Sequence, residues 1–256
     1  MKISGLQKLT LLDYPGHIAA IVFLPGCNFR CPFCQNSSLV LTPNEEPEIS
    51  QEEFFRFLKK RAGILEGICV TGGEPTLHTD LPELFRHIRE AGYLAKLDTN
   101  GTNPDMLEAM LAEGLLDYVA MDIKAGRDNY RRVCGLSCCP SAAISKDLDL
   151  TKTFEASAFL SDPLLAKINR SVDLLKSSSI DYEFRTTVVK GLHSEQDFLD
   201  IADWISGSKA YYLQSFRDCP EVLQQNHSFS DFTEAEMRYF LEIVQKKIPA
   251  ATLRGI

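Results

Sequence analysis

The chain lacks two features that would place it at a membrane or on nucleic acid. None of its apolar runs is long enough to span a bilayer, and the most apolar one, IAAIVFLPG (18–26), has the length of a strand. No run of Lys and Arg supplies a basic footprint, and the 256 residues carry a net charge of −8. The sequence therefore predicts a protein that binds neither membranes nor nucleic acid.

An export signal is also missing from the start of the sequence. Residues 1–16, MKISGLQKLTLLDYPG, contain two lysines but no proper apolar core and no small-residue cleavage site. We therefore expect a cytoplasmic protein. Because thiols stay reduced in that compartment, the eight cysteines indicate metal or redox chemistry rather than disulfides.

What the chain does have is a regular alternation of strand and helix patterns within one domain, residues 1–256. We expect strands at 17–26, 67–73, 93–101, 116–126, 182–191 and 209–216, and helices at 50–63, 80–92, 103–114, 164–179, 194–207 and 232–247. Asp80 and Glu83 resemble a capping box at the second helix. Residues 135–163 break the alternation and are expected to form a surface insertion between the fourth strand and its helix.

Six such units predict an α/β fold with a parallel sheet, either doubly wound or an incomplete (β/α)6 barrel. In both architectures ligands gather at the carboxyl ends of the strands. Polar residues and glycines follow the predicted strands in order, which indicates one site at that edge. They are Cys27 to Cys34, Gly72 to Glu74, Asp98 to Gly101, Asp122 with Lys124, Arg185 and Gln214.

Three cysteines in the segment GCNFRCPFCQN (26–36) form the pattern C-x3-C-x2-C through Cys27, Cys31 and Cys34. Thiolates bind zinc, copper(I) and iron–sulfur clusters. A closed zinc site usually needs a fourth Cys or His, and none lies nearby in the sequence. A [4Fe–4S] cluster with only three thiolates would leave one iron with an open coordination position.

The triplet on a loop after the first strand, with Phe33 just before the last Cys, resembles the signature of the radical S-adenosylmethionine (SAM) enzymes. This resemblance implies the incomplete barrel, a [4Fe–4S] cluster held by Cys27, Cys31 and Cys34, and SAM chelated by the fourth iron. In this family the reduced cluster cleaves SAM to a 5′-deoxyadenosyl radical, which abstracts a hydrogen atom.

The remaining motifs match the same family in order. Gly72-Gly73-Glu74-Pro75 is similar to its GGEP motif, whose backbone and carboxylate receive the methionine ammonium while the glycines allow a close approach. Asp98-Thr99-Asn100-Gly101 and Met121-Asp122-Ile123-Lys124 resemble motifs of the glycyl-radical-enzyme activases. The resemblance implies that Lys124 is a cation for a carboxylate, Asp122 a partner for ligand or substrate, and Arg185 a cation on the fifth strand.

The opening LTLLDYPGHIAAIVFLPGCNFRCPFCQN resembles the longer activating proteins of anaerobic ribonucleoside-triphosphate reductase. Such proteins abstract a hydrogen from a glycine of a large partner enzyme, and a low-potential flavodoxin or ferredoxin is the expected electron donor. Pyruvate formate-lyase activases carry His on strand six, where this chain has Gln214, so the reductase activator is favoured. The alternatives are another activase, a small-molecule enzyme such as 7-carboxy-7-deazaguanine synthase, or a non-enzymatic metal-binding module.

The other five cysteines carry a weaker signal. Cys69 lies in an apolar strand and is expected in the core. Cys134, Cys138, Cys139 and Cys219 could bind a second cluster, but their spacing matches no established pattern, and unligated thiols are the favoured interpretation. The acid-rich segment 44–53 is expected to be a solvated loop and helix start, with docking of a partner as the alternative.

Overall fold

The computed structural model describes residues 1–136, 162–225 and 229–256. Its eight strands form one sheet in the order of the sequence, β1 to β8. They are β1 (Gly5–Thr10), β2 (Ala19–Leu24), β3 (Gly67–Gly72), β4 (Leu94–Thr99), β5 (Tyr118–Asp122), β6 (Asp181–Val188), β7 (Tyr211–Ser215) and β8 (Ala251–Arg254). Strands β2 to β8 are parallel, and β1 pairs antiparallel with β2.

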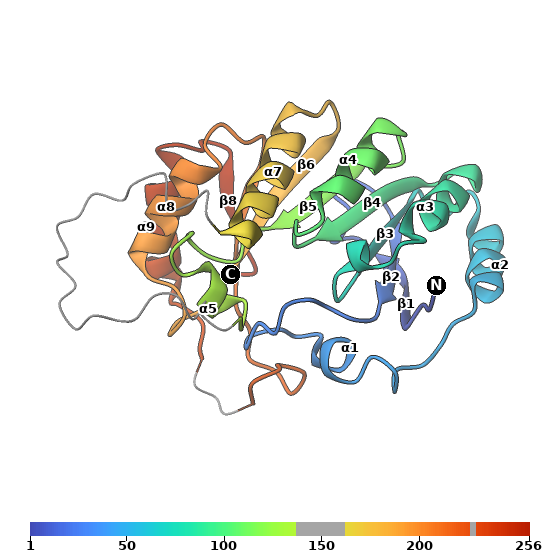
Figure 1. Cartoon of the computed structure of the whole chain (residues 1–256), viewed down its shortest axis with the longest axis horizontal. Coiled ribbons are helices and arrows are strands. Elements are labelled where there is room, and N and C mark those ends of the chain that lie inside the picture. Colours follow the sequence, from blue (N-terminus) through green and yellow to red (C-terminus); the bar gives the residue numbers. More distant parts are fainter. Residues whose placement is uncertain (137–161, 226–228) are drawn as a thin grey trace.

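The order of the strands decides between the two predicted architectures. A doubly wound sheet reverses its strand order at a switch point, whereas these strands are added one after another in a single direction. In Figure 1 the helices follow one another in an arc around the sheet, from α2 at one end to α9 at the other. The prediction of an incomplete parallel barrel is therefore confirmed.

The described helices are α1 (Ser37–Leu41), α2 (Gln51–Arg61), α3 (Leu81–Glu90), α4 (Pro104–Ala112), α5 (Tyr130–Val133), α7 (Pro163–Ser177), α8 (Glu195–Trp204) and α9 (Glu234–Gln245), with a 3-10 turn, η1 (Pro75–Leu77). The longer ones cover the outer side of the sheet, whereas the short α1 and α5 lie in the segments that follow β2 and β5 (Figure 1). Ser50 and Asn103 cap α2 and α4 as their sequences predict, each accepting a backbone N–H. The predicted capping box at Asp80 is wrong, because this carboxylate instead pairs with the amino terminus at 2.8 Å.

The structure contains two strands that the sequence pattern did not predict. β1 is mostly exposed and polar, so it has no continuous apolar run, and β8 has only four residues. They pair with β2 and β7 and form the two ends of the sheet. The bulk of the predicted insertion, residues 137–161, lies outside the described residues, so the insertion remains a prediction.

Candidate active site

The loop that carries the three cysteines runs from the end of β2 to α1 and is fixed by backbone hydrogen bonds. Arg30 donates to the carbonyl oxygens of Cys27 at 2.6 Å and Phe29 at 2.8 Å, which closes the first turn. The amide of Cys34 donates to the carbonyl of Cys31 at 3.0 Å. These contacts brace the loop from within.

A second segment, far away in the sequence, also holds this loop. Residues 216–225 follow β7, and the amide of Leu223 donates to the carbonyl of Cys34 at 2.8 Å. The amide of Gln224 donates to the carbonyl of Pro32 at 2.9 Å. The cysteine loop thus depends on contacts from the last part of the chain.

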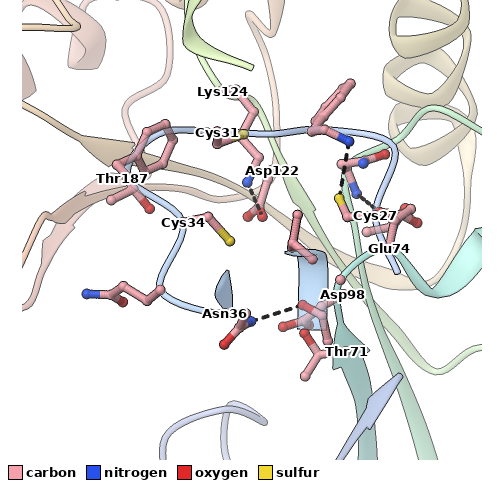
Figure 2. A pocket seen from close by; sticks show the side chains of 18 of the residues that line it. Cys27, Cys31, Cys34, Asn36, Thr71, Glu74, Asp98, Asp122, Lys124 and Thr187 are labelled. Carbon is pink, nitrogen blue, oxygen red and sulfur yellow. Dashed lines mark hydrogen bonds and ion pairs between the residues drawn. The ribbon is translucent and has the colours of Figure 1, made fainter. Parts of the chain in front are cut away.

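The three thiols border one cavity of about 240 Å³ at the carboxyl ends of the strands. In Figure 2 the loop curves around this cavity, with Cys27 and Cys34 toward its two ends and Cys31 between them. The cavity is lined by Cys27, Phe29, Cys31, Phe33, Cys34, Gln35, Asn36, Val40, Thr71, Gly72, Gly73, Glu74, Asp98, Thr99, Asn100, Asp122, Lys124, Arg185, Thr187 and Gln214. The residues expected to bind the cluster or SAM are all in this set, whereas Gly101 of the same motifs is not, and the roles assigned to the residues stay predictions.

The surroundings of the three thiols differ. Burial raises the pKa of Cys27 to about 11, and it raises the pKa of Cys34 as well. The pKa of Cys31 is lowered because the thiol of Cys134 donates a hydrogen bond to it. Binding to a metal would remove the thiol protons and offset the cost of burying the thiolates.

The donor set fits a cluster better than a single metal ion. Within residues 1–136, 162–225 and 229–256, no three Cys, His, Asp or Glu side chains converge closely enough to hold one ion. The thiols instead stand around the cavity, as thiolates do when each binds a different iron of a cluster. No fourth cysteine and no histidine lines the cavity among the described residues.

The two glycines after β3 are needed for a contact within the chain. A Cβ on Gly72 would lie 2.1 Å from the carbonyl oxygen of Leu24, and one on Gly73 would lie 1.9 Å from that of Gly26. The amides of Gly73 and Glu74 donate to these same two oxygens at 2.9 and 2.8 Å. The close approach that the motif implied is therefore to the start of the cysteine loop, which the glycines lock against β3.

The carboxylate of Glu74 is almost fully used by hydrogen bonds within the protein. It accepts from the amide and hydroxyl of Thr76 at 3.1 and 2.6 Å, and from the hydroxyl of Thr99 at 2.7 Å. Its second oxygen accepts from the amide of Asn100 at 2.6 Å. Burial raises the pKa of this carboxyl group. The geometry makes Glu74 a positioning residue that fixes the loop after β4 beside the loop after β3.

A chain of alternating charges crosses the inner face of β4, β5 and β6. Arg185 donates to Asp98 at 3.1 Å and to Asp122 at 3.0 Å, and so bridges the two carboxylates. Lys96 pairs with the far side of Asp98, and Lys124 with the other oxygen of Asp122 at 2.9 Å. Of these groups, Asp98, Asp122, Lys124 and Arg185 line the cavity, so two cations and two carboxylates lie beside it.

Electrostatics keep Asp122 ionised in this chain of charges. Burial alone would raise the pKa of Asp122, but the charges of Arg185 and Lys124 outweigh it and hold the pKa at about 2. The same carboxylate raises the pKa of Lys124 against the effect of burial. At neutral pH the cavity therefore presents fixed charges of both signs.

A buried histidine supports the segment that carries Lys124. His193 accepts from the amide of Val189 at 3.0 Å through Nδ1, so Nε2 carries the proton and donates to the carbonyl of Lys124 at 2.8 Å. Burial lowers the pKa of this imidazole, which favours the neutral form. Its ring lies edge-on to Phe33 at 6.4 Å, so it connects Lys124 with the cysteine loop.

Several residues of the cavity gave no usable signal in the sequence. Asn36 donates to the carbonyl of Gly72 at 2.9 Å, and Asn28 joins Asn100 and Thr102 through side-chain hydrogen bonds of 2.8 Å. Thr71 and Thr187 line the cavity from β3 and β6. Short polar residues of this kind are common in loops and strand ends, and only the fold brings them together.

The structure separates the remaining cysteines. Cys134 is fully buried beside Cys31, whereas Cys219 lies partly buried on the loop after β7. Cys69 is buried in β3, as predicted. Cys138 and Cys139 lie outside the described residues, so a second cluster that includes them is neither supported nor contradicted.

Comparison with known proteins connects this site to a family. The family model of the radical SAM superfamily matches residues 21–144, which include the cysteine loop. A candidate glycyl-radical enzyme activating enzyme of Methanocaldococcus jannaschii is 30% identical over 255 residues, covering 99% of this chain and 96% of the relative. The chain belongs to the radical SAM superfamily. Within it, the full-length match places the chain in the glycyl-radical enzyme activating family.

Two further proteins are similar to parts of this chain. The pyruvate formate-lyase-activating enzyme of Listeria monocytogenes is 30% identical over 133 residues, covering 48% of this chain and 53% of that enzyme. The crystal structure of Streptococcus suis SuiB has a TM-score of 0.62 and 13% identity, covering 92% of this chain and 49% of the other. The second likeness concerns the fold alone.

Membership of this superfamily makes the protein an enzyme of radical chemistry that uses SAM and an iron–sulfur cluster. The residues around the cavity suit both groups, because they combine three thiols with fixed charges of both signs. In the described part of the chain, no helix is long and apolar enough to cross a membrane.

Proposed function

We propose that this radical SAM enzyme uses a [4Fe–4S] cluster to cleave SAM and abstract a hydrogen atom from a glycine of a protein partner. The observation that carries this proposal is a cavity lined, among the described residues, by three thiols and no fourth, together with Lys124, Asp122 and Arg185. When bound, the cluster supplies one electron and an open iron position for SAM.

The residues of the cavity would then share the binding of SAM. Cys27, Cys31 and Cys34 hold the cluster on the loop that Arg30 braces. Lys124 offers a cation to the methionine carboxylate, and its backbone is positioned by the neutral imidazole of His193. Phe33, whose side chain is buried, shields the cluster from water.

The rest of the site would orient the ligand through fixed charges and polar groups. Arg185 is held between Asp98 and Asp122, so its position changes little when a ligand enters. Glu74 holds Thr99 and Asn100 in place from beneath. Gly72 and Gly73 keep the cysteine loop at a fixed distance from these groups, as their tight packing requires.

The proposed protein substrate is anaerobic ribonucleoside-triphosphate reductase. Two features support it over pyruvate formate-lyase: the opening segment 9–36 resembles reductase activators, and Gln214 stands where the pyruvate formate-lyase activases carry His. Gln214 lines the cavity from β7, as a residue that contacts the ligand or the substrate would. A low-potential flavodoxin or ferredoxin is the proposed electron donor.

Electron paramagnetic resonance (EPR) tests the proposal directly. The protein is reconstituted anaerobically with iron and sulfide, reduced, and mixed with SAM and the anaerobic reductase from the same source. We expect a glycyl doublet on the reductase and release of 5′-deoxyadenosine. Cys34→Ala should abolish both signals, and the matched control Cys219→Ala should retain them, because Cys219 does not line the cavity.

The other outcomes discriminate the alternatives. Release of 5′-deoxyadenosine without a doublet would contradict the reductase as substrate and would favour another activase or a small-molecule synthase. A doublet on pyruvate formate-lyase alone would reassign the partner. A protein with a full cluster that does not cleave SAM would favour the metal-binding module.

A further inference from the structure

A second hollow, of about 450 Å³, lies between β1 and α2 and shares no residue with the active-site cavity. We call it the basic groove, and it is lined by Leu6, Lys8, Glu53, Arg56, Phe57, Lys60 and Arg61. In the pairing of β1 with β2, Gln7 lies opposite Ile21, which is near the middle of β2. The cysteine loop begins only after the carboxyl end of β2. The groove is therefore separate from the site of the radical chemistry.

The charge of the basic groove is unusual for this chain. It holds four cations and one carboxylate, while the chain as a whole carries a net charge of −8. Among the residues that the structure describes, none of the four cations has a carboxylate within ion-pair distance, whereas cations such as Arg86, Arg170 and Arg238 are paired. The lining therefore carries an excess of three positive charges, which favours an anionic partner.

The shape of the groove suits an extended ligand. Its α2 residues run from Glu53 to Arg61 along one helical face, about 12 Å at the usual rise of an α-helix. The half-buried side chains of Phe57 and Leu6 add an apolar component, and the guanidinium of Arg61 lies over the Phe57 ring at 5.6 Å. A compact phosphate would use neither the length nor the apolar contact of this groove.

The other wall of the groove is a strand at the end of the sheet. β1 pairs only with β2 among the described strands, and Lys8 and Leu9 are exposed. An end strand with an open edge can accept a further extended segment through its backbone groups. Cationic side chains and an open strand edge thus occur at the same place.

We propose that the basic groove docks an acidic, extended segment of a partner protein, with an apolar side chain of that segment packed against Phe57 and Leu6. This inference goes beyond the proposed function, because it concerns binding outside the cavity and holds whichever molecule the radical attacks. Docking at this position would leave the opening beside the cysteine loop accessible.

The test measures binding of a fluorescein-labelled, glutamate-rich peptide with two leucines to the reconstituted enzyme by fluorescence anisotropy. We expect binding that weakens as salt rises. The double variant Arg56→Glu with Lys60→Glu should weaken it by at least about tenfold. A matched control, Lys167→Glu with Lys246→Glu, makes the same change in net charge at exposed positions outside the groove and should change affinity by less than about threefold.

Three results would overturn the proposal: no binding by the unaltered enzyme, equal losses in the two double variants, or binding of inorganic triphosphate at the groove without binding of the peptide. Hydrogen exchange gives an independent check, because a docked segment should slow exchange of β1 amides. The proposed function is tested separately in the same proteins, since both double variants should cleave SAM like the unaltered enzyme.

Discussion

Substitution of Asp122 by Asn tests the chain of charges beside the cavity. Asp122 accepts from Arg185 at 3.0 Å and from Lys124 at 2.9 Å, and its pKa is held at about 2 against an ordinary value of 3.8. Each pKa unit corresponds to about 1.4 kcal/mol, so the ionised carboxylate contributes about 2 kcal/mol at neutral pH. We expect Asp122→Asn to lose that amount of unfolding free energy.

The assay is urea denaturation of the cluster-free protein under anaerobic conditions, in which about 2 kcal/mol lowers the midpoint by about 1 M. The lowered pKa of Asp122 also predicts how its contribution to the unfolding free energy changes with pH. Because the folded-state pKa is depressed, the contribution is complete above the unfolded pKa of about 4 and is lost as the pH falls toward 2. The difference between the unaltered protein and the variant should therefore shrink over that interval.

An exposed carboxylate provides the matched control. Asp231→Asn removes the same charge at an exposed position and should change the free energy of unfolding by less than about 0.5 kcal/mol. If Asp122→Asn were equally harmless, or if its effect did not depend on pH, the ion pairs of Asp122 would contribute nothing net, and the reasoning would be wrong.

Three other predictions follow from the same site. Gly73→Ala places a Cβ 1.9 Å from the carbonyl oxygen of Gly26, so the cysteine loop must shift. We expect this variant to bind less iron per chain after reconstitution. An unchanged iron content would contradict the role of Gly73 in holding the loop against β3. Arg185→Lys cannot make both carboxylate contacts and should cost about 1–3 kcal/mol of unfolding free energy in urea, whereas equal stability would show that the bridge is dispensable. Burial lowers the folded-state pKa of His193, so its contribution to stability is present above the unfolded pKa of about 6.5 and is lost as the pH falls below that value. His193→Gln should therefore flatten the pH dependence of the unfolding free energy below about pH 6.5, and an unchanged slope would assign that dependence to other groups.

Much of the site could be predicted because of one property of parallel sheets. The carboxyl ends of the strands meet at the same edge, so Cys27, Glu74, Asp122 and Arg185 had to lie near one another once the strands were identified. Their side chains do line a single cavity. The same reasoning could not reach Asn36 or Thr187, because nothing in their sequence surroundings distinguishes them from ordinary polar residues.

Individual contacts were predicted less well than positions. The glycines of the GGEP motif indicated a close approach, but only the structure shows that Gly73 packs against Gly26 of the chain itself. Glu74 was expected to bind the ligand, yet its hydrogen bonds to Thr76, Thr99 and Asn100 use most of its acceptor capacity. A sequence motif shows which residues belong together, and the three-dimensional contacts show which of them support the others.

The hydrogen bonds from Leu223 and Gln224 to the cysteine loop have a consequence for biogenesis. Residues 32–34 leave the ribosome early, but their partners are synthesised about 190 residues later. Until then the three thiols lie on a segment without its final support. The loop that carries the three thiols is accordingly completed only late in synthesis, and a chain that ends before β7 would lack both of these hydrogen bonds.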